Sequence, residues 1–433
     1  MPRRKRQFSA IPGMFDILPN DYPLWLKVEK IVSSVANFYG FAKITTPILE
    51  DEELFIKGTG QTTEIVEKQM YSFRTKGGKR VVLRPEFTPS IVRAYIQNGM
   101  ESLPKPVKLW SFGPIFRYER PQKGRYRQFW QFNFEIFGDK SPIEDALLIQ
   151  IFSDILRDLS FEKWIVEINS IGCKDCRAYY IRRLKNYYRS QVKKICPRCK
   201  QRLKKNPLRL LDCKEEKCQR IKKFAPQIVN CLCENCHQHL KNLLEILDTM
   251  QIPYVLNPYL VRGLDYYTRT VFEFVPEDKE KEGQSTLIGG GRYDSLIAQL
   301  GGKDTSAIGG AGGVERIIEE LKEKKINVLT KRVEKFEEKP KIFLAQLGEL
   351  AKKKSLALLE DFRKNKIKVG ENLGKDNLKI QLKRAARLGV KYTLIFGQKE
   401  ALEETIILRN METGIQQIIP FKDVIKKIKK KIR

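Results

Sequence analysis

The chain has 433 residues, of which 42% are hydrophobic and 10% aromatic, and this excludes both a single small module and a wholly disordered protein. Its 82 Lys and Arg against 52 Asp and Glu give a net charge of +30, which favours a polyanionic partner, with a generally lysine-rich surface as the alternative. No stretch reaches the roughly 18 apolar residues of a membrane span, and none of signal-peptide length follows the basic start Arg3–Arg6, so we expect a cytoplasmic protein without membrane contact.

Residues 1–172 predict helices packed on an antiparallel sheet. Residues 21–39 carry apolar side chains at helical spacing and are followed by Gly40, which predicts an amphipathic helix. Short strand-like runs follow at residues 41–50 and 79–86, without the regular βαβ alternation of a parallel sheet. We therefore expect an α+β fold for this part.

The most informative stretch, residues 107–138, predicts a strand, a basic loop and a second strand. Because successive side chains of a strand face opposite ways, Gln131, Asn133 and Glu135 share one face. The other face is apolar and comprises Trp130, Phe132, Phe134 and Ile136. If the hairpin closes, polar groups line one side of a cleft; an ordinary half-solvated sheet is the alternative.

The end of the first strand and the loop that follows it both support the interpretation as a cleft. Arg117 and Glu119 are expected at strand spacing on the first strand, so that an arginine joins the polar row. The loop itself carries four basic residues and a tyrosine, namely Arg120, Lys123, Arg125, Tyr126 and Arg127. Such a loop suits phosphate contacts and base stacking, although a merely solvated turn is also consistent with it.

Residues 173–255 are predicted to be an insertion, because Lys, Arg and all nine cysteines gather there. In a reducing compartment, clustered cysteines favour metal ligands or free thiols over disulfides. Two four-thiolate zinc sites would leave Cys231 spare and would be structural, since four thiolates leave no open position for substrate. The eight candidate ligands are Cys173, Cys176, Cys196, Cys199, Cys213, Cys218, Cys233 and Cys236.

The remaining chain predicts a return to the first domain at residues 256–325, a charged linker at 326–340 and a separate domain at 341–433. In the last domain strands alternate with helices, which predicts an α/β fold with a largely parallel sheet. Its basic tail places Val424, Ile425, Ile428 and Ile432 on one helical stripe. A packed terminal helix and a free nucleic-acid arm both remain open for this tail.

Five segments in order resemble class II aminoacyl-tRNA synthetases, specifically the histidyl-tRNA synthetase family. FRYERPQKGRYRQFWQFNFEIFG is similar to class II motif 2, and LVRGLDYYTRTVFEF resembles the peptide typical of the histidine enzymes. Pro47 would be the motif 1 proline and Gly309–Arg316 motif 3. The N-terminal segment GMFDILP and the segment LRPEFTPS fit the same family. The resemblance implies a class II catalytic domain of antiparallel sheet and a C-terminal anticodon-binding domain.

The resemblance also implies a reaction and roles for individual residues. Histidine would attack the α-phosphate of ATP, supplied with Mg²⁺, and the histidyl group would then pass from the adenylate to tRNA(His). Arg117 and Arg262 would bind the α-phosphate, and Arg316 and Glu119 would serve ATP binding. The implied histidine site comprises Glu86, Thr88, Gln131, Glu135, Tyr266 and Tyr267, with Tyr293 as a further wall. Gln122 and Arg125 would contact the tRNA acceptor end, and the enzyme would be a homodimer.

Three alternatives stay open at this point. A synthetase-like regulatory subunit of histidine biosynthesis shares the fold without aminoacylating, and a non-catalytic nucleic-acid-binding protein could use the same basic surface. For Arg262, the alternative to catalysis is a structural pair with Asp265 or Glu273.

Overall fold

The computed structural model describes residues 8–277, 286–323, 340–374 and 376–432. The predicted linker, residues 326–340, falls outside the described residues except for Pro340. The chain divides into two units, Met1–Val328 and Leu329–Arg433. Among the described residues, no helix combines the length and the apolar character needed to cross a membrane.

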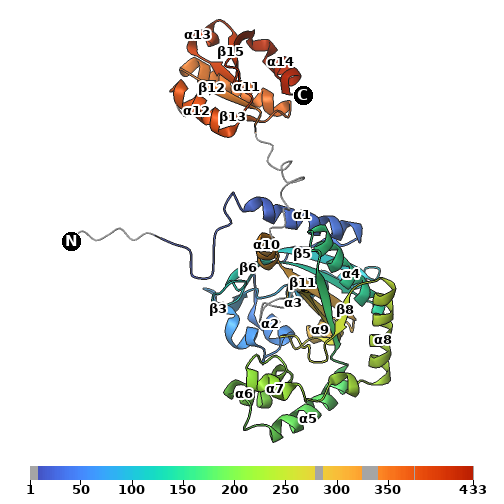
Figure 1. Cartoon of the computed structure of the whole chain (residues 1–433). Coiled ribbons are helices and arrows are strands. Elements are labelled where there is room, and N and C mark those ends of the chain that lie inside the picture. The colour runs from blue at the N-terminus through green and yellow to red at the C-terminus, as the bar shows by residue number, and fades with distance from the viewer. Residues whose placement is uncertain (1–7, 278–285, 324–339, 375, 433) are drawn as a thin grey trace, which may run out of the picture. The chain divides into compact units, whose positions relative to one another are not determined.

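An eight-stranded sheet forms the centre of the first unit (Figure 1). The inner pairings are antiparallel, and only the edge strands β1 and β8 pair in parallel, with β5 and β7. This confirms the antiparallel-rich sheet. In spatial order the strands are β1 (Ala42–Lys43), β5 (Val107–Phe116), β6 (Gln128–Phe137), β11 (Ala307–Gly313), β10 (Ile288–Arg292), β9 (Thr268–Pro276), β7 (Trp164–Ser170) and β8 (Tyr254–Leu256).

The apolar face of this sheet is covered by helices. Phe132 and Phe134 of β6 are fully buried there, as the alternation in the sequence predicts, together with Phe152 and Phe272. Burial of such large aromatic side chains is a main source of stability for a domain of this size. The covering helices are α1 (Tyr22–Phe38), α4 (Pro142–Asp158), α8 (Glu234–Thr249) and α10 (Val314–Glu323).

A second apolar cluster lies on the side of the sheet that carries the polar residues of β6, and it joins residues far apart in the sequence. Phe87, Tyr95, Tyr266 and Tyr293 all belong to it. The neighbouring elements are α2 (Glu52–Thr59), α3 (Thr88–Gln97), α9 (Leu296–Gln299), the π-helix η1 (Ile65–Gln69), and the three-stranded sheet of β2 (Leu49–Asp51), β4 (Arg80–Leu83) and β3 (Tyr71–Arg74). Because these segments meet over the polar face of β6, a cavity forms there.

The region predicted as an insertion is helical for most of its length. Its last elements, α8 and β8, belong to the core of the first unit, since Leu243 and Leu247 of α8 lie in the main cluster and β8 pairs with β7. The remaining elements are α5 (Lys174–Ser190), α6 (Pro197–Lys205), η3 (Pro207–Leu210), α7 (Glu216–Lys222) and η4 (Ile228–Cys231).

The second unit is an α/β domain, but its sheet is more mixed than predicted. β12 pairs in parallel with β13 and β14, whereas β14–β15 and β15–β16 are antiparallel. The sheet order is β13 (Val369–Glu371), β12 (Ile342–Gln346), β14 (Tyr392–Phe396), β15 (Thr405–Asn410) and β16 (Gln416–Pro420). The helices are α11 (Glu349–Lys364), α12 (Leu378–Leu388), α13 (Gln398–Leu402) and α14 (Val424–Ile432).

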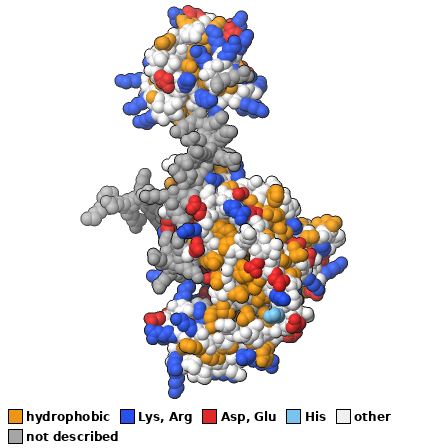
Figure 2. All heavy atoms as spheres, turned by 45° about the vertical axis from the view of Figure 1, so that its right-hand side comes forward, with side chains coloured by type: hydrophobic (Ala, Val, Ile, Leu, Met, Phe, Trp, Pro, Cys, Tyr) orange, Lys and Arg blue, Asp and Glu red, His pale blue; other side chains and the backbone are white. Residues whose placement is uncertain are grey.

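The basic tail is a packed helix. Val424 and Ile428 of α14 are fully buried in the core of the second unit, and Ile425 and Ile432 pack beside them. Lys and Arg side chains are spread over the visible faces of both units, while apolar side chains gather over one face of the first unit (Figure 2). The basic C-terminal tail is therefore a packed helix and not a free nucleic-acid arm.

Candidate active site

A cavity of about 360 Å³ opens over the polar face of the central sheet. Gln131 and Asn133 of β6 line it, as their shared face predicts, and glycines of β10 and β11 leave it open. A Cβ at Gly289 would lie 2.6 Å from the guanidinium of Arg262, and one at Gly309 would lie 1.6 Å from a carboxylate oxygen of Glu135. The glycine runs therefore provide space for neighbouring side chains.

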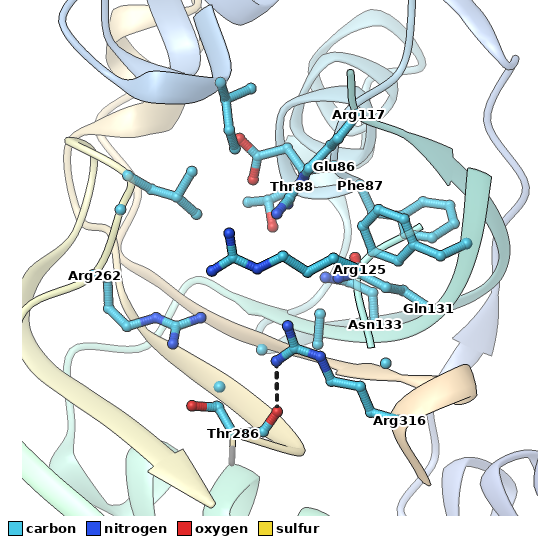
Figure 3. A pocket seen from close by; sticks show the side chains of 18 of the residues that line it. Glu86, Phe87, Thr88, Arg117, Arg125, Gln131, Asn133, Arg262, Thr286 and Arg316 are labelled. Carbon is cyan, nitrogen blue, oxygen red and sulfur yellow. Dashed lines mark hydrogen bonds between the residues drawn. The ribbon is translucent and has the colours of Figure 1, made fainter. Parts of the chain in front are cut away.

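Arginines from different elements extend into this cavity (Figure 3). Arg117 follows β5 directly, and its Nε donates to the carbonyl oxygen of Pro85 at 2.9 Å. Arg316 of α10 donates to the carbonyl oxygens of Gly124 at 3.1 Å and Thr286 at 2.9 Å. Burial and the neighbouring Arg125 and Arg117 lower the pKa of Arg316. This concentration of positive charge suits a polyphosphate.

Arg262 enters the cavity from the loop before β9. It lines the cavity and pairs with Glu273, whose other carboxylate oxygen accepts a hydrogen bond from Thr286 at 2.6 Å. Burial opposes the charged form, but the carboxylate of Glu273 outweighs it and raises the pKa of Arg262. Of the two acidic partners considered for Arg262, the structure shows a contact with Glu273. Asp265 forms hydrogen bonds with Thr62 and Asn206 instead. Arg262 is thus both paired and presented to the cavity.

Two carboxyl groups at this site are buried, those of Glu86 and Glu135. Glu86 accepts hydrogen bonds from Thr59 at 2.6 Å and Tyr266 at 2.8 Å, and burial raises its pKa. Glu135 accepts from Thr88 at 2.6 Å and from Tyr293, and burial raises its pKa to about 8.

The structure divides the predicted histidine residues into two layers. The side chains that line the cavity are Glu86, Thr88, Gln131, Tyr266 and Tyr267. Glu135, which is fully buried, and Tyr293 are not among the lining residues; Thr88 contacts the Glu135 carboxyl from the cavity side. Sequence alternation placed Glu135 on the correct face but could not show that it lies behind Thr88.

The basic loop differs from its predicted form at its first end. β5 ends at Phe116, so Arg117 and Glu119 belong to the loop rather than to the strand, although both line the cavity. Arg125 also lines the cavity and pairs with Glu119 at 3.4 Å. Gln122 is exposed, is not a lining residue and pairs with Arg125 through the backbone.

Sequence reasoning missed cavity residues from three other segments. Glu64 comes from the chain before η1, Arg209 from η3, and Thr286 from the chain before β10. Arg209 pairs with Glu64 at 3.3 Å, so the insertion itself contributes to the wall. No motif marks Arg209, which is one basic residue among many in its segment.

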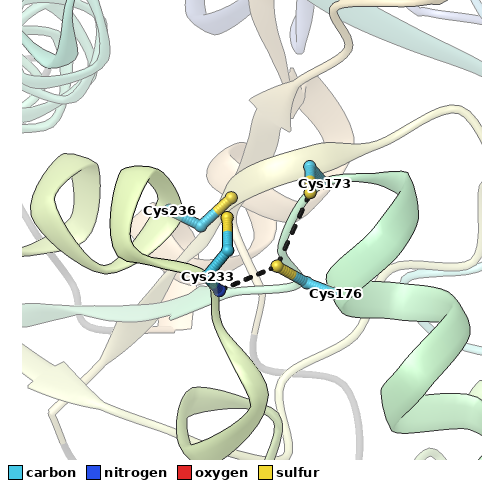
Figure 4. A group of neighbouring side chains, drawn as sticks. All are labelled: Cys173, Cys176, Cys233 and Cys236. Atoms are coloured by element: carbon cyan, nitrogen blue, oxygen red, sulfur yellow. Dashed lines mark hydrogen bonds between the residues drawn. The ribbon is translucent and has the colours of Figure 1, made fainter.

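The eight candidate cysteines form two groups, Cys173 with Cys176, Cys233 and Cys236, and Cys196 with Cys199, Cys213 and Cys218. Within each group the four sulfur atoms lie within 4.8 Å of one another. Cys231 belongs to neither group, as predicted. Figure 4 shows the first group at the start of α5 and the start of α8.

Distances between the thiols fit a tetrahedral metal. Zn–S bonds of about 2.3 Å place neighbouring sulfur atoms about 3.8 Å apart. The Sγ atoms of Cys173 and Cys176 are 3.5 Å apart, and those of Cys196 and Cys213 are 3.9 Å apart. Burial alone would raise the pKa of Cys173, but hydrogen bonds from Cys176 and its neighbours lower it to about 7, whereas burial raises the pKa of Cys176 and Cys236 in the same group.

Both units match known families. A family model described as histidyl-tRNA synthetase matches residues 13–175 and 184–317, and one described as anticodon binding domain matches residues 341–431. The chain is 44% identical over 425 residues to a histidine–tRNA ligase of Dehalococcoides mccartyi, covering 98% of this chain and 100% of that protein. It is 44% identical over 409 residues to a histidine–tRNA ligase of Thermosipho africanus, covering 94% and 96%.

Solved structures agree with this assignment. Apo histidyl-tRNA synthetase of S. aureus is 32% identical with a TM-score of 0.77, covering 97% of this chain and 99% of that one. A structure named as an ATP phosphoribosyltransferase regulatory subunit/histidyl-tRNA synthetase from Bacillus halodurans C is 19% identical with a TM-score of 0.63, covering 91% and 99%, which shows a common fold only. The resemblance found in the motifs is confirmed: the chain belongs to the histidyl-tRNA synthetase family.

Proposed function

We propose that this chain activates L-histidine with ATP and transfers the histidyl group to tRNA(His). The observation that carries this proposal is the convergence of Arg117, Arg262 and Arg316 on one cavity that also holds Glu86 and Thr88. ATP–pyrophosphate exchange measured with each amino acid tests it. Exchange with histidine alone is expected, and exchange with another amino acid alone would refute the substrate.

The first step needs charge stabilisation rather than a protein nucleophile. The histidine carboxylate attacks the α-phosphorus of ATP, the bond to the bridging oxygen breaks, and pyrophosphate leaves. Arg117 and Arg262 stabilise the negative charge on the α-phosphate oxygens, and Arg316 binds the terminal phosphates. ATP enters with Mg²⁺ as part of the substrate, and Glu119 contributes to ATP binding. Neither His237 nor His239 lines the cavity, and His239 is held by Asp145 at 2.7 Å.

The substrate side chain requires groups that distinguish an imidazole. Glu86 and Thr88 bind the α-ammonium group, while Gln131, Tyr267 and Glu135 address the two ring nitrogens. Tyr266 holds Glu86 in place through its hydroxyl group. For Glu135 to reach the ring, Thr88 must release its hydroxyl hydrogen bond, so we expect a local rearrangement when histidine binds.

The regulatory-subunit alternative is tested by the same exchange assay. A regulatory subunit without synthetase activity would show no exchange with any amino acid. A non-catalytic nucleic-acid-binding protein would bind tRNA(His) and also show no exchange. The complete set of arginines in the cavity favours the enzyme over both.

The two cysteine groups each bind one structural Zn²⁺. Four thiolates supply every position of a tetrahedral site, so no position remains for substrate or water. Elemental analysis of the protein, purified without added chelator, should give two zinc ions per chain. Free thiols would instead give zinc-free protein whose melting temperature does not change with chelator.

The remaining assignments concern assembly and tRNA. The second unit binds the anticodon region, and Gln122 and Arg125 contact the acceptor end. The protein acts in the cytoplasm as a homodimer. Its domains are the predicted ranges 1–172 with 256–325, 173–255 and 341–433, except that α8 and β8 at the end of 173–255 belong with the first of them. Sedimentation at equilibrium tests the dimer.

A further inference from the structure

The insertion holds the peptide that carries Arg262, Tyr266 and Tyr267. Arg177, on the first turn of α5, donates from Nη1 to the backbone oxygen of Asp265 at 3.2 Å and to that of Tyr267 at 2.9 Å. Burial lowers the pKa of Arg177, which fits a guanidinium removed from solvent. The backbone on both sides of Tyr266 is therefore fixed by one side chain of the insertion.

A second contact fixes the same peptide through its side chain. Asn206, which follows α6, donates from Nδ2 to Oδ1 of Asp265 at 3.0 Å and to the hydroxyl group of Thr62 at 3.3 Å. The Thr62 hydroxyl in turn donates to Oδ2 of Asp265 at 3.2 Å. Two residues further along the chain, Glu64 lines the cavity. Asn206 thus links the insertion both to the 262–267 peptide, through Asp265, and to the segment that carries Thr62 and Glu64.

Each of these contacts begins beside a cysteine group. Arg177 directly follows Cys176, and Asn206 lies between Cys199 and Cys213. The segment around Asn206 consists of short helices, and buried thiols make up much of its apolar interior. Without a metal, four thiols in each group would have only weak hydrogen bonds to hold these turns together.

We propose that metal bound in the two cysteine groups keeps Arg177 and Asn206 against the 262–267 peptide, so that metal occupancy sets the affinity of the cavity for histidine. Arg177 and Asn206 are positioning residues, because they act through Asp265 and Tyr267. The inference rests on the proposed zinc sites and the proposed histidine site. It assigns the metals a role beyond the stability of the insertion.

Arg177→Met and Asn206→Ala test the positioning contacts. Loss of a hydrogen bond to a buried group weakens an equilibrium by about tenfold, so the KM for histidine in the exchange reaction should rise about tenfold, with the KM for ATP changed less. Arg177→Lys keeps one donor and should recover part of the affinity. The matched controls are Arg182→Met, an exposed arginine on the same helix, and Asn230→Ala, an exposed asparagine in the insertion.

Metal removal tests the coupling. Histidine binding is measured by calorimetry without ATP, before and after chelation, with zinc content and melting temperature recorded on each sample. Chelated wild-type protein that remains folded should bind histidine about tenfold more weakly and recover when zinc is restored. Chelation of Arg177→Met should add a smaller loss than chelation of the wild type, because one of the two contacts that chelation loosens is already missing.

The outcomes separate the proposals on which this inference rests. Wild-type protein that loses both zinc ions, stays folded and keeps its histidine affinity would overturn the coupling and leave the zinc sites intact. Unchanged histidine KM in Arg177→Met and Asn206→Ala, with full zinc content, would overturn the positioning roles. Zinc-free purified protein would overturn the metal proposal as well, and absence of exchange in the wild type would overturn the synthetase reaction.

Discussion

Replacement of Arg262 separates its pair with Glu273, which the structure shows, from its proposed contact with the α-phosphate of ATP. The side chains of Arg262 and Glu273 are 21% and 18% exposed, so the pair is largely shielded from solvent. If the guanidinium serves the reaction, its loss affects phosphate chemistry. If it serves only Glu273, its loss affects the folded structure around β9.

The two effects have different magnitudes. Removal of a preorganised donor from a transition-state oxyanion costs about 3–4 kcal/mol, or a hundredfold to thousandfold in rate. Loss of a hydrogen bond to a charged group costs about 1.5–3 kcal/mol of folding free energy. Arg262→Met should show both losses. Arg262→Met combined with Glu273→Gln removes the unpaired carboxylate, so stability should return toward wild type while the rate does not.

Single-turnover kinetics of the two steps, with a melting curve for each variant, checks this reasoning. Arg262→Met should depress adenylate formation much more than transfer from preformed adenylate, because transfer does not cleave the ATP α–β bond. Arg262→Lys keeps the charge but loses the planar fork, so it should also be badly impaired. Equal loss in both steps, reversed by adding Glu273→Gln, would refute a role for Arg262 in catalysis.

Three further changes probe the loop, the buried carboxyl and the sheet. Arg125→Glu should weaken tRNA charging and leave adenylate formation nearly intact; equal losses in exchange and charging assays would count against a tRNA contact. Burial raises the pKa of Glu135 from 4.5 to about 8, so the folded protein binds this proton more tightly than the unfolded chain and the free energy of unfolding should fall as pH rises through that interval. Denaturant titrations without histidine should show that Glu135→Gln flattens this fall, and an unchanged slope would contradict it. Gly309→Ala would place a methyl group on the Glu135 carboxylate, and a misplacement of this kind should cost about a hundredfold in kcat/KM for histidine, with wild-type kinetics as the refuting result.

The polar face of β6 was predictable because a strand has a period of two. Gln131 and Asn133 reach the cavity and Phe132 and Phe134 reach the core, as this period requires. The depth of Glu135 was not predictable, since Thr88 comes from α3, far away in the sequence. Alternation gives the side of a sheet and contains no information about what covers it.

The cysteines show the same limit in another form. Their spacing predicts two groups of four and a spare Cys231, but it does not say which pairs combine. In the structure Cys173 and Cys176 meet Cys233 and Cys236, with the other group enclosed between them in the chain. This nesting depends on α8 returning to the core of the first unit, and its leucine pattern does not specify a partner.

The distribution of hydrogen bonds explains how the arginines of the cavity coexist with one carboxyl group that lines it, Glu86, and one that lies behind it, Glu135. Glu86 and Glu135 are satisfied by hydroxyl groups of threonine and tyrosine, and the guanidinium groups of Arg117 and Arg316 are oriented by neutral carbonyl oxygens. Neutral carbonyl partners orient these two guanidinium groups without neutralising their positive charge, so the groups keep their attraction for phosphate. Arg262 instead pairs with the carboxylate of Glu273, so ATP bound as proposed would share this guanidinium with Glu273. If Arg262 contacts the α-phosphate as proposed, its guanidinium, which Glu273 already holds in place, is preorganised to stabilise the charge that develops there in the transition state.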